Sequence, residues 1–185
     1  MDVLSEPLPG MLELHLRAFD DNRGSFAETY NRRSLAEVGI DHEFVQDNES
    51  RSSAVGTIRG LHLQLAPHAQ GKLVRVLRGA IVDVAVDLRP GSSTRLEHAA
   101  IELDADDGRL VWIPPGFAHG FCTLAPDTVV AYKVTDFYAP DTERTIRFDD
   151  PQLGISWPVA PDAAVLSDKD ADAPGLAAIV QEIDA

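Results

Sequence analysis

Two histidines in largely apolar segments are the residues of this chain best suited to proton transfer. His62 lies in the segment 59–64, where polar and apolar residues alternate as in a strand, and His119 follows a Pro-Pro-Gly turn at residues 114–116. Imidazole changes its protonation near neutral pH, so either ring could carry a proton. With Gln64 they could also be the remnant of a metal site, but Gln64 is a poor substitute for a histidine or carboxylate ligand. We predict a metal-free acid–base site, and the alternative is that both histidines are structural.

A catalytic histidine needs a carboxylate that fixes its tautomer. Two candidates fit: Asp83, on the polar face of a predicted strand, and Asp170, in the segment 166–170. The pattern does not choose between them. Tyr132, in the predicted strand 129–137, could donate a proton, although a tyrosine in an apolar strand is more often a core residue with a bonded hydroxyl.

Arg59 and His62 have opposite parity along their strand, so in a regular strand their side chains would point to opposite faces. An extra residue between them would bring both to one cavity. Glycine tolerates the backbone angles of a bulge, so we predict one at Gly60. An unbroken ladder through Gly60 would separate the two side chains.

Short alternating segments with frequent turns favour a β-sandwich or barrel. We predict strands at residues 12–19, 43–48, 80–88, 96–103, 110–113 and 129–137. Within 80–88, Val82, Val84, Val86 and Leu88 fall on one face, and Ile81, Asp83, Ala85 and Asp87 on the other. A capping box at Ser34 and a stop at Gly39 predict a helix over 34–38. From Pro151 the chain is predicted as loop, until Pro174 begins a terminal helix that ends near Asp184.

Bulk composition describes an ordinary globular protein: 185 residues with 44% hydrophobic and 25% charged residues, which fit one domain. A net charge of -14 argues against nucleic acid and anionic membranes as partners. The chain has no apolar run long enough to cross a bilayer and no signal-peptide pattern at residues 1–10. Cys122 is the single cysteine, so no intrachain disulfide can form, and we expect a cytoplasmic protein.

Motifs along nearly the whole chain resemble those of the dTDP-4-dehydrorhamnose 3,5-epimerases. Each motif alone is weak, but together and in this order they are highly specific. They occupy residues 21–28, 44–48, 59–64, 71–75, 83–89, 112–121, 132–133, 150–158 and 166–170.

The resemblance implies a fold that is mainly β, a double-stranded β-helix (cupin) jelly roll with short peripheral helices, as a single domain over 1–185. It also implies a homodimer with no metal and no cofactor. The substrate would be dTDP-4-dehydro-6-deoxy-D-glucose, inverted at carbons 3 and 5 by proton abstraction next to the 4-keto group to give dTDP-4-dehydro-L-rhamnose. The alternatives are a single-carbon (3- or 5-) epimerase of a related dTDP-4-keto sugar, or a non-catalytic cupin that binds a sugar nucleotide.

The resemblance also assigns roles to residues. His62 would be the base, paired with Asp170; Tyr132 would be the acid, and Lys72 would stabilise the enolate. The sugar and diphosphate would contact Gln46, Asn48, Arg59, His119, Tyr138 and Lys169, and the thymidine would contact Arg23, Phe26 and Glu28 across the dimer interface. The chain departs from the family at Glu49, where a histidine is common; the added negative charge either points away from the pocket or changes it.

Overall fold

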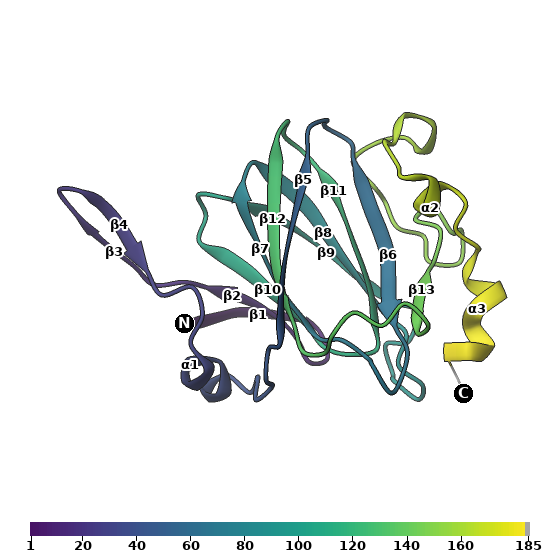
Figure 1. The fold of residues 1–185 in the computed structure, drawn as a ribbon, viewed down its shortest axis with the longest axis horizontal. Helices are drawn as coiled ribbons and strands as arrows, with labels where there is room; N and C mark the ends of the chain where they lie inside the picture. The colour runs from purple at the N-terminus through teal and green to yellow at the C-terminus, as the bar shows by residue number, and fades with distance from the viewer. Residues whose placement is uncertain (184–185) are drawn as a thin grey trace.

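Two antiparallel sheets lie face to face in the computed structural model of this protein, which describes residues 1–183 (Figure 1). The first sheet has the strand order β1 (Asp2–Leu8), β2 (Met11–His15), β10 (Arg109–Ile113), β7 (Lys72–Arg78), β12 (Thr128–Val134) and β5 (Gln46–Ser52). The second has the order β13 (Glu143–Thr145), β6 (Ile58–Gln64), β11 (Phe117–Thr123), β8 (Ala80–Asp87) and β9 (His98–Asp104). The predicted mainly β jelly roll is confirmed.

A hairpin and short helices surround the two sheets. Strands β3 (Ala18–Asp21) and β4 (Gly24–Ala27) form a hairpin that projects from the body of the molecule (Figure 1). The helices are α1 (Arg32–Glu37), the 3₁₀ helix η1 (Pro161–Ala163), α2 (Asp168–Ala171) and α3 (Leu176–Ile183). Helix α2 lies against β6.

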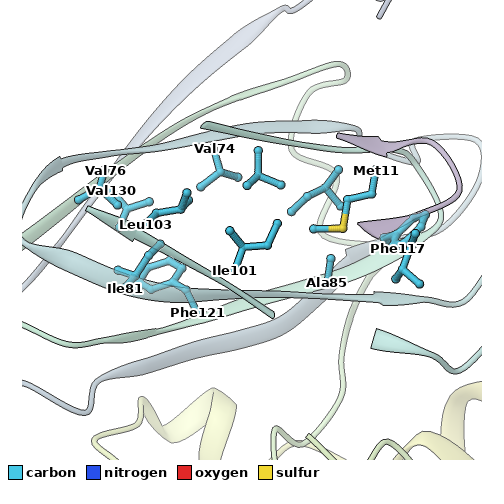
Figure 2. Packing of buried hydrophobic residues seen from close by; sticks show 13 residues of the cluster. Met11, Val74, Val76, Ile81, Ala85, Ile101, Leu103, Phe117, Phe121 and Val130 are labelled. Atoms are coloured by element: carbon cyan, nitrogen blue, oxygen red, sulfur yellow. The ribbon is translucent and has the colours of Figure 1, made fainter. Parts of the chain in front are cut away.

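The main core fills part of the space between the sheets. Inward-facing residues from both sheets, including Met11, Val74, Ile101 and Phe117, pack there in one buried cluster (Figure 2). Strand β8 shows the predicted alternation: its Ile81 side belongs to this interior cluster. Burial of such aliphatic and aromatic side chains is the main stabilising term of the sandwich.

Smaller clusters cover the outer faces of the two sheets. On the second sheet, Val84 and Val86 of β8 pack with Leu176 and Ile179 of α3. On the first sheet, Leu35 of α1 packs with buried residues of β2, β7 and β10. The two-sided burial of β8 therefore follows from the alternation in its sequence, with one face inside the sandwich and the other under α3.

Several predicted boundaries are wrong. Helix α1 begins at Arg32 because Asn31, an equally good cap, accepts the backbone N–H groups of Arg33 and Ser34, so the predicted capping box at Ser34 is not the start. The predicted strand 12–19 is divided between β2 and β3, and the strand predicted at 43–48 lies at 46–52. The segment after Pro151 contains η1 and α2, and the terminal helix begins at Leu176; its predicted end at Asp184 lies outside the described residues. Strands β1, β11 and β13 are among the strands that were not predicted.

Candidate active site

A cavity of about 420 Å³ opens between the two sheets, beside the interior core. Ten of the predicted site residues line it, from five strands, the loop after β12 and α2. They are Gln46, Asn48, Arg59, His62, Lys72, His119, Tyr132, Tyr138, Lys169 and Asp170. Residues far apart in sequence are thus brought to one polar cleft, as expected for a ligand site.

The predicted bulge at Gly60 is confirmed. On β11, His119 pairs with His62 and Phe121 pairs with Arg59, so β6 carries one residue more than β11 between these two pairs. Gly60 has a φ of +133°, and a Cβ there would lie 2.5 Å from the Cα of Gly120. The position therefore requires glycine, and the extra residue turns Arg59 and His62 toward the same cavity.

His62 is held by Asp170, one of the two candidate carboxylates. His62 Nε2 lies 2.6 Å from Oδ1 of Asp170, and the Ser167 hydroxyl donates to Oδ2 at 3.0 Å. Burial acts to raise the pKa of Asp170, but the hydrogen bond and charge of His62, with the Ser167 hydroxyl, outweigh it and hold that pKa below its usual value. The ionised carboxylate can only accept, so Nε2 carries a proton and Nδ1 is left to take one up.

Asp83, the other candidate carboxylate, is paired with the other histidine. His119 Nε2 lies 2.7 Å from Oδ1 of Asp83, and both side chains are buried. His62 and His119 are direct cross-strand neighbours, so two His–Asp pairs stand side by side on the inner face of the second sheet. The sequence pattern did not choose between Asp83 and Asp170 as the partner of a catalytic histidine. In the structure each carboxylate is paired with one of the two histidines.

Lys72 reaches into the cavity from the first sheet. Its Nζ donates to the backbone carbonyl of His62 at 3.1 Å, so the side chain bridges the two sheets. Burial lowers the pKa of Lys72 to about 8, against the opposing charges of Asp83 and Glu143. The ammonium is therefore a buried positive charge, which would be available to a developing enolate.

Tyr132 enters the cavity from β12 of the first sheet, whereas His62 enters from β6 of the second. A proton donor and a proton acceptor thus face the same space from opposite walls. Burial raises the pKa of Tyr132, with the nearby Arg59 charge opposing and the Glu143 charge assisting. The phenol therefore stays protonated at neutral pH and can act as a donor.

Glu143 is an ionisable site residue that sequence reasoning missed. Glu143 lies on β13, where it pairs with Gln64 of β6. Its Oε2 accepts from the Tyr138 hydroxyl at 2.9 Å and pairs with Lys169 Nζ at 2.7 Å. Burial acts to raise the pKa of Glu143, but these two partners hold it below its usual value. The surrounding sequence has no signal that separates Glu143 from the other acidic residues. Gln46 and Asn48, which were predicted, are joined by a 2.8 Å hydrogen bond on the wall formed by β5.

The predicted thymidine residues are not brought to this cavity within one chain. Arg23 and Phe26 lie on the projecting β3–β4 hairpin, where the Phe26 side chain is 70% exposed. Glu28 follows the hairpin and lines a separate depression near Met1. Their role in binding a nucleotide stays a prediction.

Glu49 is not among the residues that line the cavity. It alternates with Asn48 on β5, lies at a different cavity beside Lys133, and accepts from Arg51 Nε at 3.0 Å. Its side chain therefore lies outside the lining of the candidate active site. Among residues 1–183, no group of three or more histidine, cysteine or acidic side chains is arranged to hold a metal, and no helix is long and apolar enough to span a bilayer.

Comparison with known proteins decides the family. The model of dTDP-4-dehydrorhamnose 3,5-epimerase matches residues 5–178 of this chain. The chain belongs to that family. The dTDP-4-dehydrorhamnose 3,5-epimerase of Sinorhizobium fredii is 50% identical over 164 residues, which cover 86% of this chain and 82% of that protein.

Solved structures of similar proteins agree with this assignment. The dTDP-4-dehydrorhamnose 3,5-epimerase of Bacillus anthracis, with TDP and PPi bound, superposes with a TM-score of 0.92 at 46% identity, over 95% of this chain and 99% of that one. The dTDP-6-deoxy-D-glucose-3,5-epimerase of Legionella pneumophila, in complex with dTDP-4-keto-L-rhamnose, gives 0.92 at 42% identity, over 98% and 96%. The cupin jelly roll predicted from sequence is therefore the fold of this chain.

Proposed function

We propose that this chain is a 3,5-epimerase that converts dTDP-4-dehydro-6-deoxy-D-glucose to dTDP-4-dehydro-L-rhamnose. The observation that carries the proposal is the placement of the His62–Asp170 pair and Tyr132 on opposite walls of one cavity. Inversion of a carbon requires that a proton leave one face and that another arrive at the opposite face. Family membership supports the same activity.

The 4-keto group makes the protons on carbons 3 and 5 acidic. His62 Nδ1 takes the proton from carbon, and Asp170 stabilises the imidazolium that forms. The electron pair moves to the ketone oxygen as an enolate, where the Lys72 ammonium would stabilise a charge that exists only after deprotonation. Tyr132 then gives its proton to the other face of the carbon, and the enolate returns to the ketone.

The nucleotide would bind along the remaining polar wall and beyond it. Arg59 and Lys169 provide positive charge for the diphosphate in a protein whose net charge is -14. Arg23, Phe26 and Glu28 would contact the thymidine from the hairpin of a second copy in a homodimer, because within one chain they lie outside the cavity. Arg23→Ala should then weaken dTDP binding even though Arg23 does not line the cavity of its own chain.

The test is proton NMR of dTDP-4-dehydro-6-deoxy-D-glucose in heavy water with the purified protein, followed by a reductase that accepts only the inverted product. Deuterium at carbons 3 and 5, with product trapped by the reductase, is expected. Exchange at one carbon alone would identify a single-carbon epimerase. Tight dTDP binding without exchange at either carbon would overturn the proposal in favour of a binding protein.

A further inference from the structure

Asp83 is a buried carboxylate that the proposed reaction has not yet used. Its side chain is fully buried on the inner face of β8, and one oxygen, Oδ1, accepts from His119 Nε2 at 2.7 Å. The other oxygen, Oδ2, has no hydrogen-bond partner among the residues that the structure describes. A buried carboxylate oxygen without a donor is costly, and a full negative charge persists there only beside positive charge.

Lys72 is a buried cation that lines the cavity together with His119, the hydrogen-bond partner of Asp83. The lysine side chain is 8% exposed, and its one hydrogen bond is to a neutral acceptor, the carbonyl of His62. No carboxylate within 4 Å forms an ion pair with Lys72 in the part of the chain that the structure describes. Burial lowers the pKa of Lys72, and the negative charges of Asp83 and, to a lesser extent, Glu143 act in the opposite direction. Glu143 is already engaged by Lys169 and Tyr138, whereas Asp83 has an oxygen to spare.

We infer that Asp83 is a positioning residue for this site: with Oδ1 it fixes the His119 ring, and with the charge on its unbonded Oδ2 it keeps Lys72 as an ammonium. The inference deepens the proposed function and rests on it for the catalytic consequence. Fixing His119 through Nε2 directs Nδ1 of that ring to act as an acceptor, which suits a sugar hydroxyl. Keeping Lys72 charged preserves the cation that would stabilise the enolate.

Several other charged or titratable groups share the cavity with Lys72, so the effect of the Asp83 charge on the pKa of Lys72 must be distinguished from theirs. They are Arg59 and His62 on β6, His119 on β11, Tyr132 on β12, Tyr138 in the loop after β12, Glu143 on β13, and Lys169 and Asp170 on α2. Asp170 is bonded to His62 and Ser167, and Glu143 to Lys169 and Tyr138, so both of these anions are already matched by donors. Asp83 is the carboxylate whose removal should change Lys72 most.

The direct test uses the small number of lysines in this chain: Lys72, Lys133 and Lys169. Protein labelled with ¹³C at the lysine ε carbon gives three signals, which Lys133→Arg and Lys169→Arg variants assign. Asp83→Asn keeps an oxygen that can accept from His119 and removes the charge. We expect the pKa of Lys72 to fall in this variant by about 1 unit or more. Glu143→Gln is the matched control that removes a carboxylate lining the cavity of Lys72, and it should lower that pKa less.

Turnover supplies the second readout. At about pH 8, Asp83→Asn should lose ~5-fold or more in kcat, because Lys72 is then mostly neutral, and it should approach the wild-type rate near pH 6. The affinity for dTDP should stay within about threefold of wild type. A uniform loss of kcat at all pH values would reduce Asp83 to a structural residue.

The titration does not depend on catalysis, so it separates this inference from the proposed function. An unchanged Lys72 titration in Asp83→Asn, or a larger change in Glu143→Gln, would overturn the inference even in an active epimerase. If Asp83→Asn does not fold, Asp83→Ser removes the same charge with a smaller side chain. In the wild type, ¹⁵N NMR of His119 should show the proton on Nε2, and a proton on Nδ1 alone would contradict the proposed hydrogen bond.

Discussion

Replacing Lys72 with methionine should stabilise the protein while it abolishes turnover. Burial lowers the pKa of Lys72 from 10.5 to about 8, which corresponds to a cost of about 3 kcal/mol for keeping the charge in the folded state, at ~1.4 kcal/mol per pH unit. Methionine fills a similar volume without this cost but loses the hydrogen bond to the His62 carbonyl, worth about 1 kcal/mol. The net expectation is a gain of about 2 kcal/mol near pH 7.

The pH dependence identifies the cause of this gain. Because the folded pKa of Lys72 lies below its unfolded value, the unfolded state binds more protons between these two values, and wild-type stability rises with pH there. The penalty is complete below about pH 8 and disappears toward about pH 10.5, so the advantage of Lys72→Met should fade over this interval. The lost hydrogen bond and altered packing do not depend on pH.

Denaturant unfolding of both proteins at several pH values from about 7 to 10 measures the difference. Lys133→Met is the control, since Lys133 lines the other cavity, beside Glu49, and pairs with Asp47. The difference in unfolding free energy between Lys133→Met and wild type should change by less than ~1 kcal/mol over the same pH range. A constant difference between wild type and Lys72→Met would refute the argument that a buried ammonium costs stability at this position.

Three further substitutions test the acid–base pair and the bulge. His62→Ala should lower kcat by about 10²–10⁴ with dTDP affinity little changed, and a comparable loss of affinity, measured by calorimetry, would make His62 a binding residue. Tyr132→Phe should spare deuterium exchange at a carbon that needs only His62 but impair net inversion; unimpaired inversion would remove Tyr132 from the mechanism. Gly60→Ala should destabilise the fold by at least about 3 kcal/mol, because its Cβ would meet Gly120. In thermal unfolding, Gly91→Ala is the control: it also has a positive φ but open space around it, and it should cost only about 1 kcal/mol.

Local features of the chain were predictable where one residue type had one physical solution. Arg59 and His62 have opposite parity, and a bulge at Gly60 was the local way to bring both to one cavity. The alternation around Asp83 separated the two faces of β8, although it did not say which face points inward. The start of α1 was not predictable in the same way, because Asn31 and Ser34 are both good caps and tertiary packing selects between them. A local feature was therefore predictable where the sequence offered one physical solution, and not where two residues could fill the same role.

Pairing across the fold could not be read from local pattern. Asp170 is 108 residues from His62 in sequence, and only the path of the C-terminal segment across β6 joins them. Asp83 pairs with His119 because β8 and β11 are neighbours in the sheet. Glu143 joins the site only because the short strand β13 pairs with β6 at Gln64. The residues that bind or position other side chains are therefore the ones that sequence alone assigns least well.

The location of Asp170 on α2 also sets the order in which the enzyme becomes competent during synthesis. All strands of both sheets except β13 are complete by Val134, while α2 begins only at Asp168. A nascent chain can therefore close most of the sandwich, with His62 in place, before the carboxylate that orients this histidine has left the ribosome. Chains cut in the segment between β13 and α2 would hold His62 without Asp170 and would also lack α3, which packs on Val84 and Val86 of β8. Premature termination therefore yields a product that is catalytically silent and exposes an apolar face of the second sheet.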